Sequence, residues 1–252
     1  MKTQPAGELL FFIPDVHVPY HDKKAWSLVL QIIQAIKPAR VVIGGDFIDN
    51  YAISSHMKDI SRKLDWQWEI DQANIELDKL QRMLESKTRV DFIEGNHEFR
   101  WPRYLASLDS KDNRRANSMQ DILCIEERGW HWTPYKDFIK IGKLYVTHDT
   151  GKAGKYAVHQ AMDDFQSNVV INHIHRIGIV YAGDARGKSH VAASFGWLGD
   201  KAMADYMFKI KANRDWHLGF GIGYLQPNGT VHLQAVPIVD YTAVVGERKY
   251  SL

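Results

Sequence analysis

The chain has 252 residues, of which 45% are hydrophobic and 25% are charged. That balance is typical of a globular protein with a sizeable core and argues against a disordered or fibrous architecture. The net charge is only +2, so no global basic field points to nucleic acid as a partner.

The cysteine count and the apolar runs bear on the compartment. Cys124 is the single cysteine, so no internal disulfide can form, and the amphipathic segment around it predicts a buried thiol. The first residues lack the pattern of a signal peptide, and no run approaches the roughly 18 apolar residues that span a bilayer. We therefore expect a cytoplasmic protein without membrane contact.

The first elements predicted from the sequence form a strand–helix–strand unit. Residues 9–13 are an apolar run that ends at Pro14, as is typical of a buried strand. Asp22 is a candidate N-cap for a helix whose apolar residues recur at helical spacing until Pro38. A second short strand is predicted at 41–43, and such a unit favours parallel pairing with a right-handed crossover.

One long helix and then mostly strands are predicted for the rest of the chain. An apolar stripe over 65–86 predicts the helix. The strands expected after it are 90–93, 138–141 with 144–147, 169–171, 177–181 with 190–193, and 219–225 with 231–236.

The stretches between these elements are expected to be irregular. Residues 51–64, 99–137 and 197–216 are rich in charged and aromatic residues, and loops of that length in a compact domain are often functional. The sequence has no repeat, low-complexity stretch or linker. We therefore expect residues 1–252 to form a single α/β domain.

Five short polar motifs follow predicted strands. They are Asp15-Val-His17, Gly44-Gly-Asp46-Phe-Ile-Asp49, Gly95-Asn96-His97-Glu98, Thr147-His148-Asp149 and Asn172-His173-Ile-His175. Each is weak evidence alone, because a lone histidine is more often structural than a ligand. However, open α/β sheets bind ligands at the carboxyl ends of their strands, and all five motifs are predicted there. Their mixture of carboxylate, amide and imidazole groups favours Mn, Fe or Zn over Ca.

The order of these motifs, from Asp15 to His175, resembles that of the calcineurin-like metallophosphoesterases. The resemblance implies an α/β fold in which two mixed β-sheets pack as a sandwich flanked by helices. It also implies two divalent metal ions as cofactors, with Mn²⁺ as the first choice and Fe, Zn, Ni or Mg as alternatives.

The resemblance further implies a role for each motif residue. One metal ion would be held by Asp15, His17, Asp46 and His175. The second would be held by Asp46, Asn96, His148 and His173, so that Asp46 bridges the two ions. His97 would be the acid beside the leaving group, with Asp49 orienting its ring.

The chemistry of phosphate esters agrees with such a site. Two metal ions roughly 3.5–4 Å apart can clamp phosphoryl oxygens and activate a hydroxide. A histidine next to a ligand can protonate the departing alkoxide, a step worth about 10²–10⁴-fold. The chain is therefore expected to be a metal-dependent phosphoric ester hydrolase.

Two motifs depart from the family pattern. The fourth has Asp149 where the family usually has glycine, and the fifth has Asn172 where it usually has glycine. Neither change removes a ligand, but both alter the backbone at the rim of the metal site. His159 is the alternative to His148 as a ligand.

Neighbouring positions bear on the kind of ester. The serine/threonine phosphatases of this superfamily carry an arginine after the second aspartate and another before Gly-Asn-His-Glu, which grip a dianionic monoester. This chain has Asn50 and Glu94 there. A diester carries one negative charge fewer, so we expect a phosphodiesterase or nuclease acting on nucleic acid or nucleotides. The alternative is a phosphomonoesterase for nucleotides, metabolites or phosphoproteins.

Basic and aromatic residues cluster near the last three motifs. Arg100, Arg176 and Lys152 are the candidate substrate-binding residues. The others are Trp101, Arg103, Arg114, Arg115, Lys155, Tyr156, Arg214 and Trp216. Such a mixture suits single-stranded DNA or RNA, and it suits equally a solvated rim with aromatic packing.

A hypothesis of another class is a non-catalytic, metal-containing module that binds nucleic acid or protein. The presence of His97 argues against it, because a scaffold has no need of a leaving-group acid.

Overall fold

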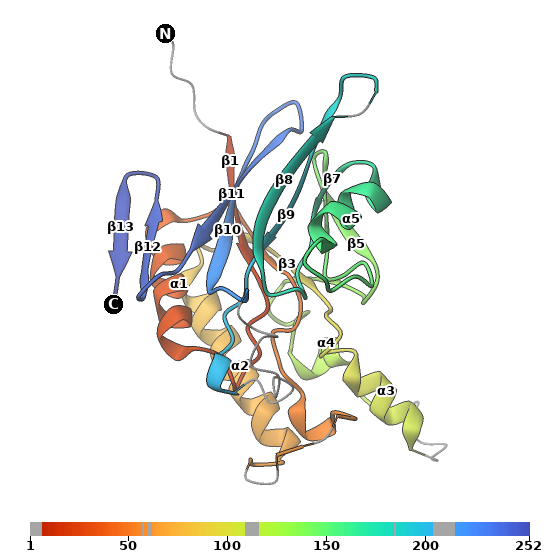
Figure 1. Ribbon diagram of the computed structural model, residues 1–252. Helices are drawn as coiled ribbons and strands as arrows, with labels where there is room; N and C mark the ends of the chain where they lie inside the picture. Colours follow the sequence, from red (N-terminus) through yellow and green to blue (C-terminus); the bar gives the residue numbers. More distant parts are fainter. Residues whose placement is uncertain (1–6, 57, 60–61, 109–115, 184, 204–214) are drawn as a thin grey trace.

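The computed structural model describes residues 7–56, 58–59, 62–108, 116–183, 185–203 and 215–252 (Figure 1). In chain order its elements are β1 (Glu8–Ile13), α1 (Lys23–Ile36), β2 (Arg40–Ile43), η1 (Tyr51–Ile53), α2 (Trp66–Met83), β3 (Arg89–Ile93), α3 (Arg100–Ser107), α4 (Met119–Ile122), β4 (His131–Thr133), β5 (Phe138–Ile141), β6 (Leu144–Thr147), α5 (Ala157–Phe165), β7 (Asn168–Val170), β8 (Ile177–Gly183), β9 (Ser189–Phe195), η3 (Lys201–Met203), β10 (Gly219–Leu225), β11 (Val231–Pro237), β12 (Thr242–Val245) and β13 (Arg248–Ser251).

The first sheet has the strand order β11-β10-β1-β2-β3-β4. β1 to β4 run parallel, while β10 pairs antiparallel with β1 and with β11. The predicted strand–helix–strand unit is confirmed, with Phe11 of β1 paired with Val41 of β2. Asp22 caps α1, because its carboxylate accepts hydrogen bonds from the N–H groups of Lys24 and Ala25, both at 3.0 Å.

The second sheet has the strand order β5-β6-β7-β9-β8. β6, β7 and β9 run parallel, and β5 and β8 pair antiparallel at the two edges. The hairpins predicted from the sequence, β5–β6, β8–β9 and β10–β11, are confirmed.

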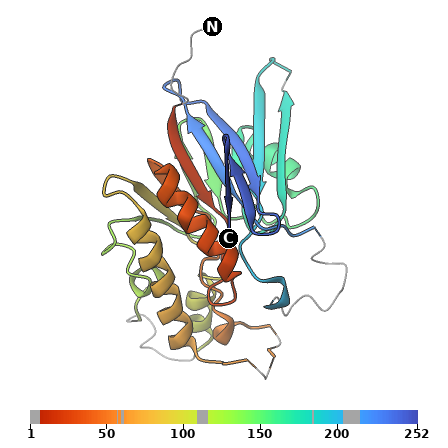
Figure 2. The same ribbon diagram turned by 90° about the vertical axis from the view of Figure 1, so that its left-hand side faces the viewer.

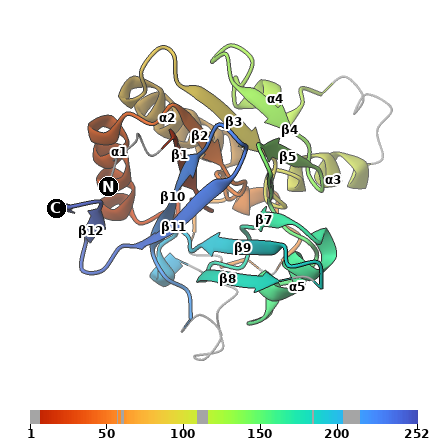
Figure 3. The same cartoon turned by 90° about the horizontal axis from the view of Figure 1, so that it is seen from above.

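The two sheets pack face to face between helical layers (Figure 3). Leu10 and Phe12 of β1 point into the core between the sheets, where Phe12 contacts Phe195 of the second sheet. Phe11 and Ile13 point the other way, into the core shared with α1 and α2. This alternation follows from the two-residue period of a strand that is buried on both faces.

Helices cover the outer faces of both sheets. α1 and α2 lie together on the first sheet, with the β12–β13 hairpin beside α1 (Figure 2). α5 covers the second sheet, where its Val158 and Met162 share a buried cluster with Val169 of β7. The predicted sandwich of two mixed sheets flanked by helices is therefore confirmed. Within the described ranges, every helix is too short or too polar to traverse a bilayer.

Two expectations about the region 99–137 are corrected. It contains α3, α4 and β4 in its described part, whereas an irregular loop was expected. Cys124 is half-buried, whereas a buried thiol was expected. α4 ends at Ile122, before Cys124, and the buried positions beside it are taken by Leu123 and Ile125.

Candidate metal centre

Each candidate ligand follows the carboxyl end of a strand. Asp15 and His17 follow β1, Asp46 follows β2, and Asn96 follows β3. His148 follows β6, and His173 and His175 follow β7. Parallel strands end at the same edge of a sheet, so each sheet gathers its own ligands at one edge. The packing of the two sheets then brings both sets together.

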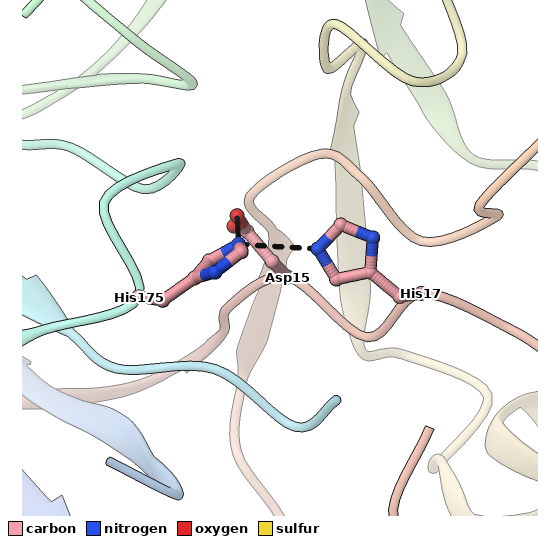
Figure 4. A group of neighbouring side chains, drawn as sticks. All are labelled: Asp15, His17 and His175. Atoms are coloured by element: carbon pink, nitrogen blue, oxygen red, sulfur yellow. Dashed lines mark hydrogen bonds and ion pairs between the residues drawn. The ribbon is translucent and has the colours of Figure 1, made fainter. Parts of the chain in front are cut away.

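Asp15, His17 and His175 form the first group of ligands (Figure 4). The Nε2 atoms of His17 and His175 lie 3.1 Å apart, and Asp15 Oδ2 lies 3.0 Å from His175 Nε2. All three residues are buried. Two ring nitrogens that point at each other and at a carboxylate oxygen need a proton or a cation between them.

The hydrogen bonding of His17 leaves its Nε2 available to a metal ion. Its Nδ1 lies 3.1 Å from Asp49 Oδ2. An ionised carboxylate only accepts hydrogen bonds, so Nδ1 carries a hydrogen, and in the neutral ring Nε2 keeps its lone pair for a metal ion.

Asp46, His148 and His173 form the second group. His148 Nε2 lies 3.3 Å from Asp46 Oδ2 and 3.0 Å from the side-chain oxygen of Asn96. The Nδ1–H of His148 donates to the carbonyl of Gly44 at 2.8 Å, which again leaves Nε2 facing the oxygens. Burial disfavours a charged ring, yet the Asp46 carboxylate raises the pKa of His148 to about 10. The group therefore favours positive charge at this point.

Buried polar atoms that lack a well-aligned hydrogen bond also indicate that a cation binds at this site. Among the described residues, the buried atoms Asp15 Oδ2, Asp46 Oδ2 and His175 Nδ1 form no well-aligned hydrogen bond. The two carboxylate oxygens face the Nε2 atoms of His175 and His148, at 3.0 and 3.3 Å. Uncompensated buried carboxylate oxygens are costly unless paired with positive charge. The mixture of carboxylate, amide and imidazole donors fits divalent cations of the borderline class.

Glu98 holds the ligand loops together without being a candidate ligand. Its buried carboxylate accepts four backbone hydrogen bonds, and the donors are the N–H groups of Asp46 (2.8 Å), Phe47 (2.7 Å), Ile48 (3.1 Å) and Gly95 (2.9 Å). Burial, and then the nearby Asp46 carboxylate, raises the pKa of Glu98 to about 7. Sequence reasoning missed this role, although the residue stands in the third motif.

Gly95 permits a close approach between the loops after β2 and β3. A Cβ atom at Gly95 would lie 2.2 Å from Asp46 Oδ1 and 2.3 Å from the Asp46 nitrogen. The N–H of His97 also donates to Asp46 Oδ1 at 2.8 Å. Only glycine fits at this position while Asp46 keeps its place.

Four candidate ligands have a left-handed backbone. The φ angles are 60° at His17, 49° at Asp46, 67° at His173 and 57° at His175. Such conformations are rare outside glycine, cost about 1–3 kcal/mol each and cluster at functional sites. The backbone strain at these four residues therefore lowers the stability of the fold, and in return it directs the four side chains toward the site.

His97 is buried beside the second group, and its contacts refine the expected role of Asp49. The His97 Nδ1–H donates to the backbone carbonyl of Asp49 at 2.8 Å, while the Asp49 carboxylate lies 3.6 Å from Nδ1 and hydrogen-bonds His17. Burial lowers the pKa of His97 to about 3, so the ring is neutral at pH 7. Arg100 Nη2 donates to His97 Nε2 at 3.0 Å. A ring acting as an acid must first lose that contact and gain a proton.

A cleft of about 380 Å³ opens over the two groups. It is lined by Asp46, His56, Asn96, His97, Arg100, Ala153, His173, Ile174, His175, Arg176 and Trp216. Two of the three candidate substrate-binding residues, Arg100 and Arg176, are therefore in the lining. Lys152 is exposed and lies outside it, next to Ala153.

Other residues singled out in the sequence lie away from the cleft. His159 is exposed on α5 and belongs to neither ligand group. The side chain of Asn50 is fully buried, and Glu94 accepts a hydrogen bond from the Tyr135 N–H at 2.9 Å. Arg114, Arg115 and Arg214 lie outside the described residues.

Comparison with known proteins identifies the family. The model of the calcineurin-like phosphoesterases matches residues 10–222. The chain belongs to the calcineurin-like phosphoesterase family. Together with the two ligand groups, this membership supports a metal-dependent phosphoester hydrolase.

Relatives and solved structures extend this comparison. The chain is similar to the Gene 54 proteins of Mycobacterium phages D29 (27% identical over 242 residues) and L5 (25% over 243), covering 90% of this chain and 92% of each relative. Among solved structures, Chaetomium thermophilum Vps29 gives a TM-score of 0.48 at 10% identity, covering 98% of this chain and 99% of that one. The phosphoesterase Yfce from E. coli gives 0.39 at 13% identity, covering 90% and 98%.

Proposed function

We propose that this protein is a dinuclear metal-dependent phosphodiesterase that acts on nucleic acid or nucleotides. The observation that carries the proposal is that two clusters of possible ligands with no residue in common, Asp15-His17-His175 and Asp46-His148-His173, meet at one cleft. Asp15, His17 and His175 would hold one ion, and Asp46, Asn96, His148 and His173 the other. Asp46 is proposed as the bridge, and Mn²⁺ as the first ion to test.

The chain's own residues divide the remaining work. When bound, divalent ions would supply positive charge against the phosphoryl oxygens. Arg100 lies in the cleft and can exchange its contact with His97 for one with a phosphoryl oxygen. That exchange would leave His97 Nε2 facing the leaving group. Asp49 fixes the rings of both His17 and His97.

The lining of the cleft favours an anionic substrate. Among the described residues, Asp46 is its single acid, and Asp46 is a candidate ligand. Arg100 and Arg176 also line the cleft and contribute positive charge to it. This pair of arginines is also a specific argument for the second candidate function, a phosphomonoesterase, because a dianionic phosphate needs more cationic help than a diester.

Steady-state hydrolysis of a nitrophenyl phosphodiester and the matching monoester, after reconstitution with Mn²⁺, tests the proposal. Diester turnover should exceed monoester turnover and should vanish with EDTA. The His97→Ala variant should bind metal but turn over unactivated alkyl esters about 10²–10⁴-fold more slowly. Preference for the monoester would favour the second candidate, and two bound ions without turnover of either ester would contradict both.

A further inference from the structure

Helix α3 extends away from the body of the molecule (Figure 1). Its first residue, Arg100, lines the cleft, yet none of its residues through Ser107 is buried. Surface helices of globular proteins normally bury one apolar face. The helix carries Trp101 and Tyr104 together with Arg100 and Arg103, and no acidic residue. Trp101 packs against the main core, but core packing does not explain the exposed Arg103 and Tyr104.

Three aromatic rings form a stack that runs along the start of this helix, which we call the aromatic track (Trp66, Trp101 and Tyr104). The rings of Trp66 and Trp101 lie 4.0 Å apart at 25°, and those of Trp101 and Tyr104 lie 6.0 Å apart at 21°. Tyr104 stands at the end of the series and is 38% exposed. The last ring of the stack, that of Tyr104, is therefore accessible to solvent.

Hydrogen bonds fasten the aromatic track to the catalytic loops. The indole N–H of Trp66 donates to the side-chain oxygen of Asn50 at 2.8 Å, and the Asn50 amide donates to the carbonyl of His97 at 2.9 Å. The indole N–H of Trp101 donates to the carbonyl of Asn117 at 2.8 Å. These bonds fix Trp66 and Trp101 before any ligand binds, and the Tyr104 ring is supported by its stacking on Trp101. Such preorganisation lowers the entropic cost of binding.

The charge and the flat rings together define the ligand. Cationic side chains beside exposed aromatic rings bind single-stranded nucleic acid, because the backbone contacts the cations while unpaired bases stack on the rings. Bases in a duplex are already stacked on one another and cannot use such a ring.

We propose that α3 is a binding arm that guides single-stranded nucleic acid into the metal cleft. A base stacks on Tyr104, one phosphate contacts Arg103, and a neighbouring phosphate reaches Arg100 in the cleft. This inference rests on the proposed function, whose substrate it narrows to an unpaired strand.

Fluorescence anisotropy of a labelled 12-nucleotide oligothymidylate, with Mn²⁺-loaded protein carrying His97→Ala to prevent turnover, tests the arm. Adding Tyr104→Ala should weaken binding about 5- to 100-fold, and Tyr104→Phe should restore it. Arg103→Ala should lower the slope of log affinity against log salt by about 0.7. The matched control is Tyr181→Ala, because Tyr181 is 65% exposed on β8, far from α3, and should leave affinity unchanged.

A parallel assay separates failure of the arm from failure of the proposed function. Tyr104 and Arg103 do not line the cleft, so their variants in the otherwise native chain should hydrolyse the small nitrophenyl diester at the native rate. Native diester turnover with oligonucleotide affinity unaffected by Tyr104→Ala would overturn the arm alone. Equal affinity for a duplex, or self-association through α3 in place of oligonucleotide binding, would overturn it as well. No diester turnover by the native chain would instead contradict the proposed function.

Discussion

At the scale of single residues, the candidate metal centre depends on side chains that hold the candidate ligands in position as well as on those ligands themselves. Glu98 is the clearest case. Oε1 accepts from the N–H groups of Phe47 and Ile48, and Oε2 accepts from those of Asp46 and Gly95. Every acceptor position is used, so no orientation of an amide can replace this carboxylate.

We expect Glu98→Gln to destabilise the protein by about 1–3 kcal/mol, because its NH₂ group must face buried N–H donors. The displaced Asp46 loop should also bind metal more weakly. Urea unfolding in EDTA and the metal content after dialysis measure the two effects. Glu126→Gln, at an exposed position, is the control. Unchanged stability would show that Glu98 does not organise the loop.

The candidate ligands carry a clear signal in the sequence, whereas the residues that support them do not. Asp15, Asp46 and His148 stand in short motifs at strand ends, where both the residue type and the position carry a signal. Three of the four partners of Glu98 lie about fifty residues earlier in the chain, so these contacts follow only from the parallel pairing of β2 and β3. The contact of Arg100 with His97 likewise depends on side-chain geometry that no spacing reveals.

At the scale of elements, the loop after β7 carries two ligands on a left-handed backbone. His173 has φ of 67°, where glycine has no steric penalty and alanine does. We expect the metal-free His173→Gly variant to be about 1 kcal/mol more stable than His173→Ala, while both bind metal weakly.

Thermal unfolding in EDTA measures this difference. The same pair of substitutions at His159, inside helix α5, is the control. There alanine should be the more stable by about 1 kcal/mol, because glycine is a poor helix former. If alanine were the more stable substitution at His173 as well as at His159, the loop would have relaxed out of the left-handed conformation.

Helices and strands were predicted most successfully where apolar residues recur in the sequence at a regular spacing. α1, α2 and all strands of the two sheets except β4 were predicted from their apolar patterns, whereas α5 was missed although it buries Val158 and Met162. α3 buries no residue and β4 has three residues, so neither offers a period to detect. The Trp66–Trp101 stack likewise joins two elements whose approach depends on the tertiary fold.

At the scale of the whole molecule, the two sheets share one core. Leu10, Val42 and Ile93 of the first sheet belong to the same buried cluster as Val146 and Phe195 of the second. A core of this kind cannot be divided without exposing apolar surface on both sides. This continuity supports the proposal that the chain is one domain.

We expect a single cooperative unfolding transition in EDTA that moves to higher temperature with Mn²⁺. A free ion at 100 times its dissociation constant adds about 2.7 kcal/mol to the free energy of unfolding, because it binds the folded state alone. Circular dichroism during heating measures the shift. Two separate transitions would contradict the single domain, and a midpoint unaffected by Mn²⁺ would contradict a metal site.

The division of ligands between the sheets also has a consequence for the order of events during synthesis. Asp15, His17, Asp46 and Asn96 leave the ribosome first, whereas His148, His173 and His175 follow about fifty to eighty residues after Asn96. Domains fold largely as units as the chain emerges. A nascent chain that ends between the two sets therefore offers an incomplete coordination sphere, and neither proposed ion can be captured with its full set of ligands until the second sheet has been made. Metal loading would thus be a late event in the life of this protein, timed by the position of His175 in the sequence.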